Sequence, residues 1–424
     1  MDFKVIVKEQ LKELEEIDRQ ETFILREFEK DASKFLRYPN ILAVLGVRRC
    51  GKSIFSYMLT KGHDFGYINF DDERLIGVSA GDLNRVLEAF YELYGDVEYI
   101  VLDEIQNIKN WELFANRLRR TKKVIITGSN SKLLTGELAT HLTGRYIDIQ
   151  LFPFSFREFL SLKRFTSSKV YTTKEKAKLF GLLNEYLKLG GLPEVYKFGK
   201  GILPRIYDDI ITKDIVLRYR IRKREELRKL ARYLVTNFAG EISYSKLSRI
   251  LGIKHVSTVS NWISYLEQAF LIIKLERFDF KLKQQFVAPK KVYAIDSGIA
   301  NSIGFSSSEN TGRIMENTVA VELQRQCGSG RIFEVYYWKD HQQNEVDFVL
   351  KDGPKVKQLV QVTYATERHE VNERETKSLL KASKELRCNN LLVITWDLSG
   401  KEKIGEKEVT FIPLWTWLLQ IDRL

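Results

Sequence analysis

The residues from Gly46 to Ser53 have the types and spacing of a loop that binds the phosphates of a nucleotide. They follow the pattern G-x-x-x-x-G-K-S. In such a loop, main-chain N–H groups point at phosphate oxygens, the lysine (Lys52) reaches the β- and γ-phosphates, and the serine hydroxyl coordinates Mg²⁺. The pattern predicts binding of ATP and Mg²⁺. The residues expected to contact this cofactor are Gly46, Val47, Arg48, Arg49, Cys50, Gly51, Lys52, Ser53 and Ile54.

Two adjacent acidic residues are arranged like the acidic pair that holds Mg²⁺ and activates water in an ATP-hydrolysis site. Asp103 and Glu104 directly follow the apolar residues 99–102. We expect Asp103, together with Ser53, to hold the metal, and Glu104 to polarise the attacking water. Such a pair close to a phosphate-binding lysine (Lys52) indicates a hydrolase rather than a passive nucleotide binder.

Three further polar residues are candidates for catalysis. Ser129 and Asn130 follow the next apolar run, where either side chain could orient the lytic water; the alternative is that they cap the helix that follows. Arg145 could stabilise transition-state charge across a subunit interface, and the alternative is a surface arginine in a turn. The expected catalytic set is Lys52, Asp103, Glu104, Asn130 and Arg145.

A regular alternation of strands and helices must position these residues. Four apolar runs have the character of buried strands: 41–45, 67–70, 99–102 and 124–127. Helical patterns lie between them, which predicts a parallel sheet with helices on both faces. The phosphate loop then lies between the first strand and a helix N-terminus, where anions bind well. Residues 6–38 predict one or two amphipathic helices.

The composition describes a folded protein of several domains. The 424 residues are too many for one ordinary core, so we expect about two to four domains. Apolar residues make up 44% of the chain and there are only seven prolines, which excludes a disordered chain. The net charge of +12 suits a polyanionic partner such as DNA.

Cysteine usage and hydropathy favour the cytoplasm. Cys50, Cys327 and Cys388 are too far apart for a disulfide framework or a zinc knuckle. The first residues lack the apolar core of a signal peptide, and no stretch approaches the ~18 uncharged apolar residues of a membrane span. We therefore expect a cytoplasmic protein without a membrane partner.

The middle of the chain predicts a DNA-binding element. After a polar loop at 162–178 and a helical region at 179–225, the pattern is helix (227–238), short helix capped by Ser243, helix (257–266) and strand, which is typical of a winged helix-turn-helix. The alternative is a winged helix that contacts only protein. Candidates for phosphate and base contacts are Lys246, Arg249, Lys254, His255, Ser257, Thr258, Ser260 and Asn261, with Lys281 and Lys283 in the wing.

The order of motifs over nearly the whole chain resembles one known group of proteins. These motifs are Gly46–Ser53, Tyr67–Asp72, Asp103–Gln106, Leu142–Arg145, Pro153–Phe159 and Gly190–Glu194. Together they resemble the prokaryotic and archaeal AAA+ ATPases that carry a C-terminal domain similar to PD-(D/E)xK nucleases. The resemblance places a sensor residue on Ser129 or Asn130 and the family's Gly-Arg arginine on Arg145.

The resemblance implies an α/β fold with a P-loop AAA+ parallel-sheet core and a homo-oligomeric ring. It implies a helical lid, a winged helix-turn-helix domain and a C-terminal α/β restriction-endonuclease-like domain. The expected segments are 1–38 (N-terminal helices), 39–160 (ATPase core), 161–226 (lid), 227–285 (winged helix) and 286–424 (nuclease-like domain).

The nuclease-like pattern is incomplete in this chain. The pattern needs a helix glutamate, a strand aspartate, and an acid and a lysine on the next strand. Glu316 and Asp347 match the first two, but Gln361 stands at the acidic position and Thr363 at the lysine position. A neutral amide binds Mg²⁺ weakly and threonine carries no charge. We therefore expect a vestigial site in a domain that docks DNA or a partner and cleaves little or nothing; alternatively, these acids are ordinary surface charges.

Three functions follow from these residues. The first is a Mg²⁺-dependent AAA+ ATPase that engages DNA, including branched DNA, through its winged helix and terminal domain. The second is a nucleotide-switched regulatory or defence module that docks a protein partner. The third is an ATP-dependent nuclease, which Gln361 and Thr363 disfavour.

Overall fold

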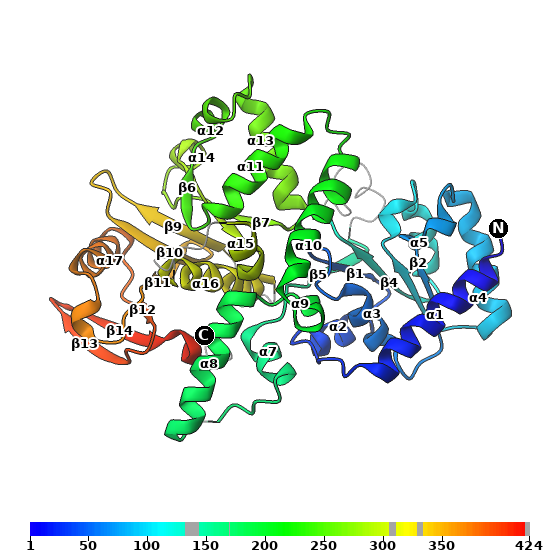
Figure 1. Cartoon of the computed structure of the whole chain (residues 1–424). Helices are drawn as coiled ribbons and strands as arrows, with labels where there is room; N and C mark the ends of the chain where they lie inside the picture. Colours follow the sequence, from blue (N-terminus) through cyan, green and yellow to red (C-terminus); the bar gives the residue numbers. More distant parts are fainter. Residues whose placement is uncertain (132–143, 169, 305–310, 329–333, 420–424) are drawn as a thin grey trace. The chain divides into compact units, whose positions relative to one another are not determined.

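The structure is a computed structural model that describes residues 1–131, 144–168, 170–304, 311–328 and 334–419 (Figure 1). The chain folds as two units: residues 1–152 with 268–270 form the first, and 153–267 with 271–424 form the second. The finer boundaries expected from the sequence stay predictions. None of the helices in the described ranges has the length and apolar character needed to cross a bilayer.

The first unit contains a five-stranded sheet in the order β2-β3-β4-β1-β5. All neighbouring strands are parallel, and Val44 of β1 pairs with Thr127 of β4 and Ile149 of β5. The four predicted strands are confirmed, and a fifth is added at the edge. The bounds are β1 Ile41–Leu45, β2 Phe65–Asn69, β3 Tyr99–Asp103, β4 Lys123–Gly128 and β5 Tyr146–Gln150.

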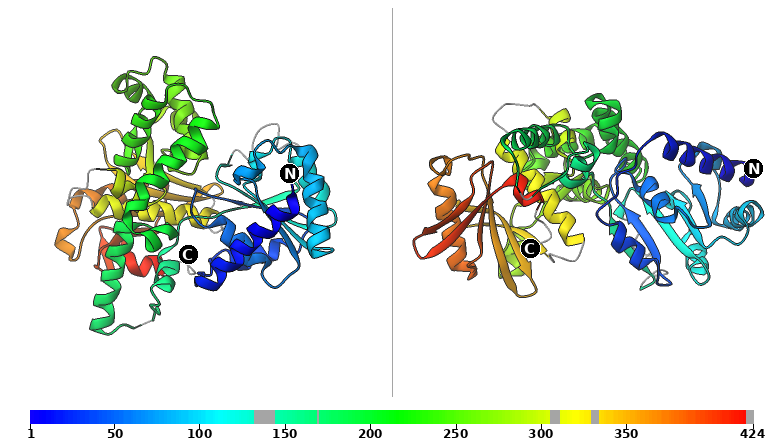
Figure 2. Two further views of the ribbon diagram at one scale, coloured as in Figure 1. Left: turned by 45° about the vertical axis from the view of Figure 1, so that its right-hand side comes forward. Right: turned by 90° about the horizontal axis from the view of Figure 1, so that it is seen from below.

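Helices lie on both sides of this sheet (Figure 2). The amphipathic α1 buries Phe3, Ile6, Val7 and Leu14, and it packs against α4 and β2. The α-helices of this unit are α1 Phe3–Gln20, α2 Glu29–Phe35, α3 Lys52–Thr60, α4 Leu83–Tyr94 and α5 Glu112–Leu118. Short 3₁₀ turns lie at η1 Glu73–Leu75, η2 Ala80–Asp82 and η3 Ile105–Asn107.

The second unit begins with a helical region in which one sequence prediction was wrong. The loop predicted at 162–178 ends earlier, because α8 begins at Thr173. The cause is a capping box: Thr172 Oγ1 accepts from the Glu175 N–H at 3.3 Å, and Glu175 Oε2 accepts from the Thr172 N–H at 2.8 Å. The bounds are α7 Phe156–Leu162, α8 Thr173–Leu189, α9 Pro193–Phe198, η5 Lys200–Ile202, α10 Leu203–Asp209 and the π-helix η6 Ile210–Leu217.

A small antiparallel sheet follows, in the order β6-β8-β7. Helix α11 precedes β6, and helices α12 and α13 connect β6 to β7. Gly252 follows the short helix α12 and has a φ of 64°, the left-handed conformation common for a glycine after a helix. Ser243 precedes α12, but its side chain makes no capping hydrogen bond. The bounds are α11 Arg224–Thr236, β6 Gly240–Ile242, α12 Tyr244–Ile250, α13 Val256–Gln268, β7 Ile272–Leu275, α14 Leu282–Val287, β8 Lys290–Ala294 and α15 Ser297–Ile303.

The last part of the second unit is a six-stranded mixed sheet in the order β13-β14-β12-β11-β10-β9. Strands β9, β10 and β11 are antiparallel neighbours, whereas β12 is parallel to both β11 and β14. Apolar residues of α16 and α17 belong to two separate cores on opposite faces of this sheet. The bounds are α16 Thr311–Gly328, β9 Glu334–Lys339, β10 Glu345–Asp352, β11 Lys355–Val362, η8 Arg368–Glu370, α17 Glu373–Leu386, β12 Leu391–Thr395, β13 Gly400–Ile404, β14 Lys407–Pro413 and α18 Leu414–Leu419.

Candidate functional site

The predicted phosphate loop connects the buried strand β1 to the N-terminus of α3. Gly46 N donates to the carbonyl oxygen of Gly128 at 3.3 Å, which ties the loop to β4. Gly51 is the N-cap of α3 and has φ 97°, a left-handed conformation that favours glycine. The first helical hydrogen bond runs from Phe55 N to Gly51 O. The N–H groups of the preceding turn therefore lie at the positive end of α3, which is a ready anion site.

The loop lysine and the second acidic residue are in contact. Lys52 Nζ lies 3.4 Å from Glu104 Oε1, and the two side chains are only 5% and 13% exposed. Lys52 Nζ also lies 3.4 Å from the carbonyl oxygen of Val47. The structure thus brings Lys52, at the start of α3 and expected to bind phosphate, next to Glu104, which directly follows β3 and is expected to activate water.

Asp103 is buried at the end of β3, where several hydroxyl groups surround it. Its Oδ2 accepts from the Tyr67 hydroxyl at 2.7 Å, and its Oδ1 accepts from the Thr127 hydroxyl. Burial and Glu104 raise the pKa of Asp103, while hydrogen bonds from Thr127, Ser53 and Tyr67 lower it; the net shift is upward. A serine hydroxyl beside a carboxylate is the donor set that P-loop proteins use for Mg²⁺, so Ser53 and Asp103 fit this ion.

Glu104 has a left-handed backbone, with φ 51° and ψ 40°. Its N–H donates to Thr127 Oγ1 at 2.9 Å, and the Gln106 amide donates to its carboxylate. Burial raises the pKa of Glu104, but Lys52, Arg48 and the hydrogen bond from Gln106 outweigh burial and leave the pKa below its ordinary value. The carboxylate is therefore anionic at neutral pH, as a general base must be. A strained backbone at a reactive residue is common in active sites.

Sequence reasoning missed four residues that position this site. Tyr67 and Thr127 hold Asp103, Gln106 holds Glu104, and Arg26 donates to the carbonyl oxygen of Cys50 in the phosphate loop at 2.9 Å. Thr127 is a polar residue near the end of an otherwise apolar strand, so the sequence did contain a sign that it contacts a polar group. Arg26 gave no signal, because its partners are main-chain atoms far along the chain.

The remaining catalytic candidates, Ser129, Asn130 and Arg145, lie next to β4 and β5. Ser129 and Asn130 are fully buried just after β4, at the same carboxyl edge of the sheet as Asp103. Arg145 is exposed just before β5, and its carbonyl oxygen accepts from Ile41 N at 3.0 Å. The helix expected after Asn130 and the motif residues 142–143 lie outside the described residues. The sensor and arginine-finger roles stay predictions.

The DNA-binding candidates are on accessible parts of the second unit. Lys246 and Arg249 are exposed on α12. Six further candidates lie in the turn before α13 and in its first two turns: Lys254, His255, Ser257, Thr258, Ser260 and Asn261. The exposed members of this group are Lys254, His255, Ser257 and Asn261, whereas Thr258 and Ser260 are partly buried. Lys281 and Lys283, expected in a wing, lie instead at the start of the short helix α14.

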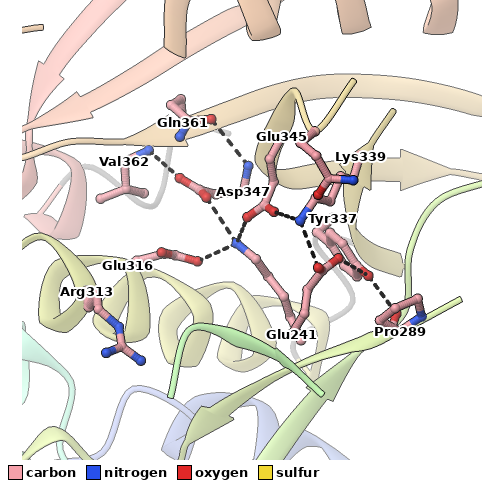
Figure 3. Close-up of polar contacts among 12 residues, drawn as sticks. Glu241, Pro289, Arg313, Glu316, Tyr337, Lys339, Glu345, Asp347, Gln361 and Val362 are labelled. Atoms are coloured by element: carbon pink, nitrogen blue, oxygen red, sulfur yellow. Dashed lines mark hydrogen bonds and ion pairs between the residues drawn. The ribbon is translucent and has the colours of Figure 1, made fainter. Parts of the chain in front are cut away.

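The nuclease-like residues do converge, but around a lysine that the sequence prediction did not include. Figure 3 shows the carboxylates of Glu316, Glu345 and Asp347 pointing toward one another from α16 and β10. Between them lies Nζ of Lys291, a residue of β8. The positive charge in this cluster thus comes from β8 of the three-stranded sheet.

Gln361 and Thr363 carry no charge, and the Thr363 side chain hydrogen-bonds to Glu375 of α17. Gln361 Oε1 accepts from the Asp347 N–H at 3.4 Å, and the Thr363 N–H donates to the carbonyl oxygen of Ile394 at 2.9 Å. Across the described ranges, no group of three or more His, Cys, Asp or Glu side chains is arranged to hold a metal ion.

Comparison with known proteins agrees with the geometry of the first unit. An AAA domain matches residues 38–160, and two domains of unknown function, DUF8612 and DUF4143, match residues 181–309 and 311–417. A solved Walker-type ATPase of Pyrococcus abyssi is 14% identical, with a TM-score of 0.45, and the match covers 66% of this chain and 96% of that one.

Two relatives match along almost their whole length. An uncharacterized protein of Methanocaldococcus jannaschii is 37% identical over 442 residues, covering 99% of this chain and 96% of its own. An uncharacterized protein of Haemophilus influenzae is 30% identical over 399 residues, covering 90% of this chain and 94% of its own. The chain therefore belongs to the same family as these archaeal and bacterial proteins, and its first unit is an AAA-type P-loop ATPase domain.

Proposed function

We propose that this protein hydrolyses ATP with Mg²⁺ and uses the reaction to change its engagement with DNA. The observation that carries the ATPase part is the contact of Lys52 with Glu104 next to the buried Asp103. These groups meet at the carboxyl edge of a parallel sheet, where ligands of α/β proteins bind.

Each residue has a distinct task in this reaction. The N–H groups of the phosphate loop and Lys52 hold the β- and γ-phosphates, and Glu104 accepts a proton from the attacking water. Ser53 and Asp103 would hold Mg²⁺, which bridges phosphate oxygens and neutralises developing charge. Asn130 and Arg145 are proposed to orient the water and, from a neighbouring copy in a homo-oligomeric ring, to stabilise the transition state.

The DNA part rests on the small antiparallel sheet and its helices. From α11 to β8 the order is helix, strand, helix, helix, strand, helix, strand, and the part from α11 to β7 supports a winged helix with α13 as the recognition helix. Exposed lysine, arginine, serine and asparagine side chains on α12 and α13 suit phosphates and base edges. The net charge of +12 favours the same partner.

The terminal domain is the second part of the chain that we propose to contact DNA. A helix (α16), three antiparallel strands (β9 to β11), a second helix (α17) and a parallel strand (β12) are the elements expected of a nuclease-like fold. This part of the proposal rests on fold analogy.

The test is ATP turnover measured without DNA and with duplex, single-stranded and four-way DNA. We expect Mg²⁺-dependent phosphate release that DNA changes severalfold, and binding that weakens steeply with salt. A double variant, Lys246→Ala with Arg249→Ala, should lose the DNA response and keep basal turnover. Basal turnover that persists after Lys52→Ala would refute the ATPase assignment, and a flat salt dependence of binding would refute the phosphate contacts.

A second candidate function is a nucleotide-switched module that docks a protein. One observation favours it: Phe280, Leu282, Phe286 and Val287, in and beside α14, are all at least 66% exposed. Exposed apolar side chains grouped in one segment commonly mark a protein contact. In that case ATP turnover is indifferent to all three forms of DNA, so the same assay separates the two functions.

A further inference from the structure

The carboxylate cluster of the second unit has an unusual composition. Glu316 comes from α16, whereas Glu345 and Asp347 come from β10. The resemblance to PD-(D/E)xK nucleases puts Glu316 and Asp347 at positions where such an enzyme holds its metal. Figure 3 shows the carboxylates of Glu316, Glu345 and Asp347 turned toward a common centre.

The group at the centre of the cluster is an ammonium. Lys291 Nζ lies 2.9 Å from Glu316 Oε1, 2.6 Å from Glu345 Oε1 and 3.2 Å from Asp347 Oδ1. The Lys291 side chain is only 2% exposed. Three N–H donors of an ammonium match three carboxylate acceptors. The space that a divalent ion would need is therefore filled by the protein itself.

The charges around Lys291 keep it protonated. Burial lowers the pKa of Lys291, but Glu316, Tyr293, Asp347 and Glu345 outweigh burial and raise the pKa well above its ordinary value. The Tyr293 hydroxyl donates to Glu316 Oε1 at 2.7 Å, and the Val362 N–H donates to Asp347 Oδ2 at 3.0 Å. Glu316 and Asp347 thus each accept from a donor besides Lys291.

The residues do not fit a divalent metal. Gln361 is neutral where the third strand should supply a carboxylate, and its Oε1 is used by the Asp347 N–H. A resident metal would also have to displace a buried ammonium that lies within 3.2 Å of three carboxyl groups. We propose that Lys291 is the built-in cation of this cluster and stands where a metal-dependent nuclease of the fold would bind its ion.

The same cluster joins the two sheets of the second unit. Lys291 belongs to β8 of the three-stranded sheet, whereas its partners lie on α16 and on β10 of the six-stranded sheet. A second pair lies beside it: Lys339 Nζ of β9 is 2.7 Å from Glu241 Oε2 of β6 and 3.1 Å from Glu345 Oε2. Lys291 therefore fastens the three-stranded sheet to α16 and to the six-stranded sheet without a metal. This inference does not depend on ATP hydrolysis.

The experiment removes the ammonium and asks whether a metal takes its place. In Lys291→Met, three carboxylates face a space without a cation, which suits an oxygen-liganded divalent ion. We expect one Mn²⁺ or Ca²⁺ site per chain beyond those of the wild type, measured by calorimetric titration without nucleotide. Losing one partner of a buried ion cluster should lower the apparent Tm by roughly 5–15 °C, and Mn²⁺ should restore part of this loss.

Two variants serve as controls. Lys290→Ala removes the neighbouring buried lysine, whose Nζ contacts the Gln285 carbonyl oxygen at 2.6 Å and Glu276 at 3.4 Å. It should gain no metal site. Adding Asp347→Asn to Lys291→Met should abolish the gained site.

A measurement on the wild type decides the question even if Lys291→Met does not fold. Titrations of the wild type and of Asp347→Asn with Mn²⁺ should be identical, and neither should nick DNA in Mg²⁺ or Mn²⁺. A wild-type Mn²⁺ site that Asp347→Asn removes would overturn the proposal, as would metal-dependent nicking that the same substitution abolishes. A folded Lys291→Met that gains no site would overturn it as well.

Discussion

Replacing Glu104 by glutamine separates nucleotide binding from hydrolysis. The substitution keeps the shape and the contact with Gln106 while removing the negative charge that faces Lys52 at 3.4 Å. A general base contributes about 10²- to 10⁴-fold to a rate, which is about 3–5 kcal/mol of activation free energy. We therefore expect Glu104→Gln to lower kcat by at least 100-fold.

The same contact predicts the effect on affinity. At an effective dielectric constant of about 20, charges 3.4 Å apart attract each other by roughly 5 kcal/mol before desolvation is counted. In the nucleotide-free protein this attraction holds Lys52 on Glu104, and ATP must compete for the same ammonium. Because a neutral amide competes less, the affinity for ATP should stay equal or rise by up to about tenfold, or about 1.4 kcal/mol.

Phosphate release and calorimetric ATP binding measure the two effects. Glu98→Gln is the matched control, since this exposed glutamate immediately precedes β3 and should leave both quantities unchanged. Wild-type turnover in Glu104→Gln would refute the role of Glu104 as base. A large loss of ATP affinity would show instead that Glu104 mainly shapes the loop.

Three further predictions concern the supports of the two units. Gln106→Leu removes the amide that holds Glu104, so kcat should fall about tenfold with little change in KM, measured by steady-state turnover. Burial raises the pKa of Asp296 to about 6, above its unfolded value near 3.8. The free energy of unfolding should therefore fall by about 3 kcal/mol as the pH rises from 4 to 7, because the folded state binds the proton more tightly. Urea titrations should show this decrease in the wild type and a flatter pH dependence in Asp296→Asn. An alanine Cβ at Gly191 would lie 2.3 Å from a main-chain carbonyl oxygen, so Gly191→Ala should lower the free energy of unfolding by roughly 1–3 kcal/mol. Gly181 lies in α8 with open space around it, so Gly181→Ala should raise the free energy of unfolding by roughly 0.5–1 kcal/mol in the same assay.

Strand burial explains which parts of the sheet were predictable. Strands β1, β3 and β4 are covered on both faces, so their sequences are continuous apolar runs. Strand β5 lies at the edge of the sheet, and only Ile149 of its residues is buried. Its sequence has no such run, and it was missed for that reason.

The start of α8 was missed for a different reason. The composition of residues 162–178 is polar, which is typical of a loop but also of the first turn of an exposed helix. The capping pair of Thr172 and Glu175 decides between them, and its spacing was present in the sequence.

The amino-acid sequence by itself determined the phosphate loop, the acidic pair and the strands that carry them. These features are local: each depends on residues within one strand, turn or helix, and their spacing is set by backbone geometry. Glu316 and Asp347 were likewise identified from their places in a pattern.

Only the tertiary structure decided which charges meet. In the sequence, Lys290 and Lys291 are two adjacent lysines that look like a surface pair. The pairing of β8 with β6 and β7 buries Lys291 among carboxylates from elements that are distant in the chain. Burial and opposite charge act through space, so no local pattern could show that Lys291 would meet carboxylates of α16 and β10.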